Sequence, residues 1–197
     1  MELRLATPEQ LETVYDADLK VSFPAAELKP LRIIQRMLED GYYRPWCLFD
    51  GTEIVGECFL WLGEPGWALL DYLCISPRCR NGGLGALLLE KMLEAEPGVV
   101  ILGESEMPEY APDPAMAQRR LGFYARNGAR TAGYDTEMFG VPYKTLYWAE
   151  GKVDESALME EHRFVYASTF APDKFRRYVR IPFDPNGTPG ERVSWQQ

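Results

Sequence analysis

The sequence contains little of what metal chemistry requires. It has one histidine, His162, and its four cysteines form no C-x-x-C pair. His162 lies in the run Glu160-Glu161-His162-Arg163, which reads as the exposed surface of a helix. We therefore expect no metal site, because zinc ligands come as closely spaced groups of Cys and His. Unpaired cysteines also favour a reducing, cytoplasmic setting.

Basic residues and long apolar runs are also scarce. The chain carries 21 Lys and Arg against 30 Asp and Glu, a net charge of −9. Nucleic-acid binding needs a basic surface, so no nucleic-acid partner is expected. No run of about 18 apolar residues and no N-terminal signal segment occurs, which argues against a membrane span or export. The 46% of hydrophobic residues suffices for the core of one enzyme domain, and the acidic balance suits a cationic substrate.

The most informative segment runs from Leu69 to Met92, LLDYLCISPRCRNGGLGALLLEKM. It predicts a buried strand, a glycine-rich turn and an amphipathic helix. Arg80, Gly83 and Gly85 form R-x-x-G-x-G, in which the glycines allow a tight turn and expose backbone N–H groups where the helix begins. The spacing matches neither the P-loop nor the dinucleotide motif G-x-G-x-x-G.

This loop resembles motif A of the GNAT acetyltransferase superfamily, whose Q/R-x-x-G-x-G/A segment binds the CoA pyrophosphate. A second segment, LGFYARNGAR over 121–130, resembles the family's F-Y-x-x-N-G-F, with Ala129 in place of the last aromatic. The resemblance implies that acetyl-CoA is the acyl donor and that Tyr124 returns a proton to its sulfur. The residues expected to contact CoA are those of the loop and of the strand edge before it: Cys74, Ile75, Arg80, Asn81, Gly82, Gly83, Leu84, Gly85 and Ala86.

Acetyl transfer to an amine also needs a proton acceptor, because an ammonium group cannot attack a thioester. Three carboxylates stand near the ends of expected strands, namely Asp71, Glu104 and Glu106. We favour Glu104 as the base and assign Glu106, on the same face of its strand, to binding of the acceptor. Asp71 and Glu106 stay open as alternative bases. A further alternative is that all three carboxylates only make the cleft negative, with water taking the proton.

The order of elements over residues 1–150 resembles the whole GNAT fold, an α/β arrangement. It implies a central mixed, twisted sheet of about six to seven strands flanked by helices. Expected strands cover 2–6, 44–49, 54–62, 69–76, 99–104, 131–138 and 144–150; expected helices begin near 8 and 114 and cover 25–39 and 83–94. Residues 151–197 form a C-terminal extension with helical spacing over 156–170 and a flexible tail. We expect it to pack on the domain, and a homodimer contact is the alternative.

Together these features indicate an N-acetyltransferase that moves an acetyl group from acetyl-CoA to a primary amine of a small molecule or a peptide by direct attack. The alternative is a non-catalytic CoA-binding module that acts through a protein partner. Tyr124 together with Glu104 favours the enzyme, because a binding module has no need of a proton donor near the thiol. The pattern does not indicate which amine is the acceptor.

Overall fold

The computed structural model describes residues 1–195. The last two residues of the expected extension, Gln196 and Gln197, lie outside the described residues. The chain divides into two compact units. The first contains residues 1–62, 70–97 and the end of the chain from 194; the second contains residues 63–69 and 98–193. The expected division into a domain of residues 1–150 and an extension of residues 151–197 stays a prediction.

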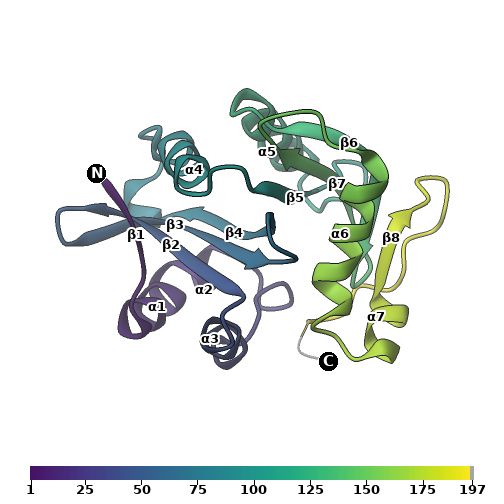
Figure 1. Ribbon diagram of the computed structural model, residues 1–197, viewed down its shortest axis with the longest axis horizontal. Helices are drawn as coiled ribbons and strands as arrows, with labels where there is room; N and C mark the ends of the chain where they lie inside the picture. The colour runs from purple at the N-terminus through teal and green to yellow at the C-terminus, as the bar shows by residue number, and fades with distance from the viewer. Residues whose placement is uncertain (196–197) are drawn as a thin grey trace. The chain divides into compact units, whose positions relative to one another are not determined.

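The first unit carries four neighbouring strands in the order β1-β2-β3-β4. Their bounds are Glu2–Leu5 (β1), Tyr43–Asp50 (β2), Glu53–Leu62 (β3) and Trp67–Ile75 (β4, of which the first three residues belong to the second unit). The helical segments are Pro8–Val14 (α1), a π-helical turn at Tyr15–Leu19, Lys20–Ser22 (α2), Leu31–Glu39 (α3), a 3-10 turn at Pro77–Cys79 and Leu84–Ala95 (α4). In Figure 1, α4 covers one face of these strands, while α1 and α3 lie on the other.

Local sequence explains how these elements begin and pack. Thr7 caps α1: its hydroxyl accepts from the N–H of Gln10, and the Gln10 side chain accepts from the N–H of Thr7, a reciprocal capping box. The Asp50-Gly51 turn joins β2 to β3, with Gly51 at φ +62°. Gly56 leaves room for β4 and α4 beside β3, since a Cβ there would lie 2.6 Å from Ile75 Cδ1 and 3.2 Å from Leu88 Cδ2. These positions set the start of α1, the turn between β2 and β3, and the room beside β3 for its neighbours.

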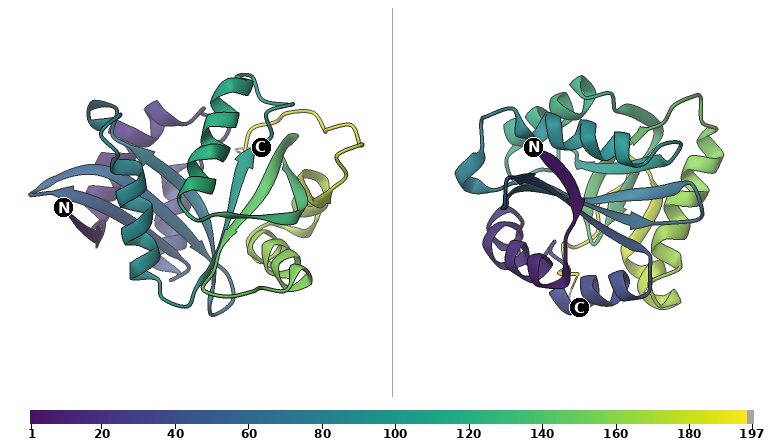
Figure 2. Two further views of the ribbon diagram at one scale, coloured as in Figure 1. Left: turned by 90° about the horizontal axis from the view of Figure 1, so that it is seen from above. Right: turned by 60° about the vertical axis from the view of Figure 1, so that its left-hand side comes forward.

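The second unit carries the strands β5-β7-β6-β8, and each neighbouring pair is antiparallel. Their bounds are Val100–Glu106 (β5), Arg130–Met138 (β6), Val141–Trp148 (β7) and Val179–Phe183 (β8). Its helices are Pro114–Arg126 (α5), Glu155–Ala167 (α6) and Pro172–Tyr178 (α7). α5 packs against β5, whereas α6 packs against β6 and β8. The further views in Figure 2 show α6 running beside these strands.

The observed elements follow the expected order with two differences. The segment 25–39 is not one helix: α3 begins only at Leu31, and Pro24 and Pro30 flank an irregular stretch. The described chain also has eight strands rather than six to seven, because β8 comes from the C-terminal extension and pairs with β6. The extension is therefore partly strand rather than only helical.

Candidate active site

The glycine-rich loop of the first unit presents a helix N-terminus. Gly83 is the N-cap of α4 and adopts φ +76°, and Asn81 has φ +68°. Leu84 and Gly85 open the helix, so their N–H groups have no carbonyl within it to bond. A Cβ built on Gly83 would meet no atom within 4 Å, which leaves this stretch of backbone open. Exposed N–H groups at the positive end of a helix dipole suit a phosphate.

Arg80 lies at the start of this loop, with its side chain held over the end of β4. Its Nε donates to the carbonyl of Ile75 at 3.2 Å, and its Nη2 donates to Ser22 Oγ at 2.8 Å. The residue is exposed, and a guanidinium has further donors beyond these two. Arg80 therefore sits beside the helix N-terminus with N–H groups left for an anion.

The strand in front of the loop carries a buried polar cluster rather than a reactive thiol. Cys74 Sγ donates to Glu57 Oε2 at 2.9 Å, and Ser76 Oγ donates to Asp18 Oδ1 at 2.8 Å. Burial raises the pKa of Cys74 far above that of an ordinary thiol. Burial likewise raises the pKa of Glu57 to about 8, and the Asp18 charge adds to this while the bond from Cys74 opposes it. Cys74 is thus a protonated thiol and no nucleophile.

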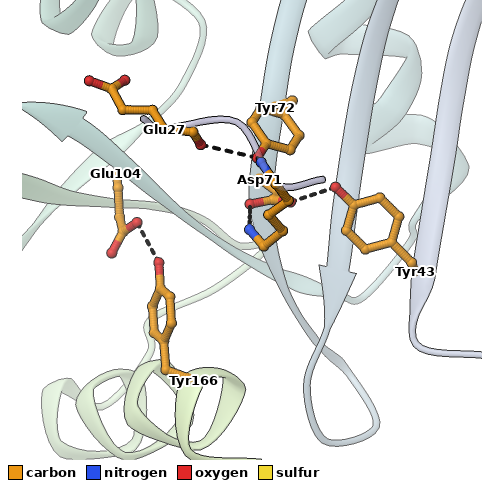
Figure 3. Close-up of polar contacts among 7 residues, drawn as sticks. Glu27, Tyr43, Asp71, Tyr72, Glu104 and Tyr166 are labelled. Atoms are coloured by element: carbon orange, nitrogen blue, oxygen red, sulfur yellow. Dashed lines mark hydrogen bonds and ion pairs between the residues drawn. The ribbon is translucent and has the colours of Figure 1, made fainter. Parts of the chain in front are cut away.

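Asp71, one of the three candidate bases, is fully engaged within the first unit. Lys29 Nζ lies 2.5 Å from its Oδ1, and Tyr43 OH donates to its Oδ2 at 2.5 Å (Figure 3). The side chains of Lys29 and Asp71 are only 4% and 8% exposed. The Lys29 ammonium also lies over the rings of Trp61 and Trp195, 4.6 and 4.1 Å from their centroids. Asp71 is therefore the counter-ion of a buried lysine.

Glu104, on β5 in the second unit, has hydrogen-bond partners on two residues of α6. Tyr166 OH donates to its Oε2 at 2.7 Å, as Figure 3 shows, and His162 Nε2 lies 2.9 Å from its Oε1. Thr136 adds a longer contact of 3.4 Å to Oε1. The Glu104 side chain remains 13% exposed. A carboxylate has about four lone-pair positions, so this one can still accept a proton or a hydrogen bond.

His162 does not lie on a helix surface, as the sequence had suggested. Its side chain is 0% exposed, with Nε2 at Glu104 and Nδ1 3.2 Å from Tyr134 OH. The neighbouring charges misled the interpretation, because Leu158, His162, Val165 and Tyr166 are the buried residues of α6. That spacing of four, seven and eight residues is a helical stripe. This stripe is the sequence signal that could have predicted the burial of His162 and Tyr166.

Glu106, two residues beyond Glu104, has a different set of partners. Its Oε1 lies 2.9 Å from Arg192 Nη2, and the same Nη2 donates to the carbonyl of Tyr110 at 2.8 Å. Glu104 and Glu106 stand opposite Thr145 and Tyr143 on β7. The described end of the chain thus occupies Glu106, the residue expected to bind the acceptor.

Tyr124 lies near the end of α5, half-buried, with its ring edge-to-face against Trp148 at 5.7 Å between centroids. Trp148 Nε1 donates to the carbonyl of Asn127, which caps the helix, and Gly128 follows at φ +84°. The Asn-Gly pair therefore ends α5 as expected and fixes the ring of Tyr124 against β7. Within its unit Tyr124 is held by aromatic packing.

The expected site residues thus fall into two sets. The first unit holds the CoA loop, Cys74, Ile75 and Asp71; the second holds Tyr124, Glu104 and Glu106. Sequence reasoning missed Lys29 and Tyr43 around Asp71, and His162 and Tyr166 around Glu104. Within residues 1–195 no group of three or more His, Cys, Asp or Glu side chains is arranged to hold a metal ion. Over the same residues no helix is long and apolar enough to span a bilayer.

Comparison with known proteins places the chain among acetyltransferases. Residues 9–126 match the model of the acetyltransferase (GNAT) family. A GNAT-family protein from Bacteroides thetaiotaomicron is 21% identical with a TM-score of 0.67, over 83% of this chain and 95% of its own. The ribosomal-protein-S18-alanine N-acetyltransferase of Escherichia coli is 13% identical with a TM-score of 0.59, over 78% and 96%.

A GNAT-like decarboxylase in complex with isobutyryl-CoA is 21% identical with a TM-score of 0.58, over 76% of this chain and 99% of its own. At these identities the likeness shows the fold and not the reaction. No curated protein matches the chain in sequence.

Proposed function

Because the chain belongs to the GNAT acetyltransferase family, we propose that this enzyme transfers the acetyl group of acetyl-CoA to a primary amine of a small molecule or a peptide. One observation carries the proposal beyond the family: Glu104 is a carboxylate whose neighbours are the hydroxyl and imidazole donors of Tyr166 and His162, and whose side chain is still 13% exposed. Such a group can take the proton that an ammonium must lose.

The loop residues supply the binding part of the proposal. The N–H groups of Asn81 to Gly85 and the guanidinium of Arg80 would hold the pyrophosphate, and the edge of β4 at Cys74 and Ile75 would pair with the pantetheine arm. The open backbone at Gly83 fits this use. When bound, acetyl-CoA supplies a thioester, an acyl group already activated for attack by a neutral amine.

The proton steps fall to residues of the second unit. Glu104 takes a proton from the acceptor ammonium, which leaves a neutral nitrogen with a free electron pair for attack on the carbonyl carbon. Tyr124 gives its phenolic proton to the departing sulfur. Asp71 and Glu106 are less suited to the first step, since Lys29 and Arg192 already hold their carboxylates.

The experiment is thiol release from acetyl-CoA in the presence of polyamines, aminoglycosides and peptides, with mass spectrometry of the acetylated product. Glu104→Gln and Tyr124→Phe should each lower turnover by on the order of 10- to 1,000-fold, with CoA affinity kept. Glu160→Gln, the same charge change at an exposed position of α6, serves as control.

Two results would count against the proposal. CoA binding by calorimetry without turnover on any amine would favour the non-catalytic module. Wild-type turnover in both variants would remove Glu104 and Tyr124 from the chemistry.

A further inference from the structure

Helix α6 of the C-terminal extension reaches Glu104 with two side chains at once. His162 and Tyr166 are four residues apart, so they lie on one face of the helix, one turn from each other. Their donors meet the two different oxygens of one carboxylate, at 2.9 Å and 2.7 Å. Both side chains are buried, at 0% and 1% exposure. A carboxylate whose two oxygens are both hydrogen-bonded to side chains of one helix has little freedom to rotate.

The hydrogen-bond chain fits one arrangement of the protons, with His162 neutral and Glu104 acting as acceptor. An ionised carboxylate accepts only, so His162 Nε2 must carry the hydrogen in the bond to Glu104. Nδ1 of the neutral ring is then an acceptor, and the Tyr134 hydroxyl, 3.2 Å away, donates to it. Tyr134 can play this part throughout the working pH range, because burial and the Glu104 charge raise its pKa well above that of an ordinary phenol. Donors run in one direction, from Tyr134 through His162 to Glu104.

We infer that His162 and Tyr166 are positioning residues that hold the Glu104 carboxylate in one orientation through contacts to both of its oxygens, so that the C-terminal extension completes the catalytic site. The inference rests on the proposed function of Glu104 as base. His162 does not carry the substrate proton away, because its Nε2 is already protonated and its Nδ1 faces Tyr134. The proton taken from the acceptor stays on Glu104 until solvent removes it.

The first test reads the imidazole directly. His162 is the only histidine in the chain, so a protein labelled with ¹⁵N-histidine gives one pair of ring-nitrogen signals. We expect the shifts of a neutral ring with hydrogen on Nε2. A hydrogen on Nδ1, or a ring in fast tautomer exchange, would overturn the inference. This measurement needs no acceptor amine and no variant.

The second test separates positioning from packing. His162→Phe and Tyr166→Phe remove a donor but keep a ring, and each should lower kcat about 10-fold with little change in KM. Loss of a donor favours the protonated carboxyl, so the acidic limb of the pH profile should move to higher pH. His162→Gln keeps an N–H donor at this position and should recover part of the rate, while the exposed Glu160→Gln should match wild type. The Gln variant also covers the case in which Phe does not fold.

A double variant makes the link to Glu104 explicit. In a Glu104→Gln background, loss of the His162 donor should add little further, since the group it positions has gone. Full additivity, or an unmoved pH profile in both Phe variants, would reduce α6 to a packing element and overturn the inference. Unchanged turnover in Glu104→Gln alone would refute the proposed function and the catalytic part of the inference with it. The ¹⁵N signals would still show whether the contact exists, so the two failures are distinguishable.

Discussion

The buried carboxyl of Glu57 gives the sharpest prediction about stability. Glu57 is 0% exposed on β3, where it faces Cys74 of β4 and the charge of Asp18 from the π-helical turn, with a smaller opposing effect of Arg78. Its ordinary pKa is 4.5, and burial raises it to about 8 in the folded protein. The folded chain therefore keeps a proton on Glu57 over a range of pH in which the unfolded chain has lost it.

The sign and size follow from proton linkage. Between pH 4.5 and about 8 the folded state binds more protons at Glu57 than the unfolded state does, so this group lowers the free energy of unfolding as pH rises. The slope is about 1.4 kcal/mol per pH unit, and the whole interval amounts to roughly 5 kcal/mol. Below pH 4.5 the penalty is absent, and above pH 8 it is complete.

Glu57→Gln keeps the shape of the side chain and removes the ionisation. The free energy of unfolding of the variant, relative to that of the wild type, should therefore rise by about 1.4 kcal/mol for each pH unit from pH 5 to pH 8. Urea denaturation at four pH values, followed by both circular dichroism and fluorescence under reducing conditions, measures this difference. Glu53→Gln, an exposed position on the same strand, should run parallel to wild type. If the free energy of unfolding of Glu57→Gln also follows that of the wild type at every pH, Glu57 does not hold its proton in the folded protein, and the prediction is wrong.

Two further predictions use the glycines at positive φ. Gly83→Val should weaken CoA binding in calorimetry about 10-fold or more, because a side chain would stand where the backbone is now open; Gly41→Val, at φ +84° and also without neighbours within 4 Å, controls for backbone strain alone. An equal affinity in both variants would count against the loop as the CoA site. Gly140→Ala should loosen the end of the chain, since its Cβ would lie 2.3 Å from the carbonyl oxygen of Glu191. We expect a loss of about 2 kcal/mol in stability and faster trypsin cleavage at Arg192, against little change in cleavage for Gly41→Ala.

Local signals in the sequence were sufficient for much of the fold. The capping box at Thr7 and the Asn127-Gly128 stop each form hydrogen bonds between residues a few positions apart. The local sequence is therefore enough to predict them. The conformation of the glycine-rich loop likewise depends on residues within the loop itself, such as Gly83 at φ +76°. β8 was missed although Val179, Ile181 and Phe183 alternate as buried residues, because the extension was expected to be helical and to end in a flexible tail.

The environment of the site residues could not be predicted in this way. Lys29 lies 42 positions from Asp71, and His162 lies 58 positions from Glu104. No local pattern encodes such partners, because each pair forms only when distant elements pack. His162 was misplaced for a related reason: charged neighbours at 160, 161 and 163 suggest solvent, whereas burial follows the helical stripe through Leu158 and Val165.

The partners, rather than the residue type, separate two of the candidate carboxylates, Asp71 on β4 and Glu104 on β5. If Asp71 took a proton from a substrate, the Lys29 ammonium would remain buried without its counter-charge, which costs several kcal/mol. If Glu104 took one, Tyr166 and His162 would still lie within hydrogen-bond distance of it, and no buried lysine would lose its counter-ion. The cost of protonation therefore supports the proposal that Glu104 rather than Asp71 takes the proton, and Asp71 holds Lys29 among its aromatic neighbours. A family pattern that counts positions along a strand cannot make this distinction, since it depends on which side chains the rest of the chain brings to each carboxylate.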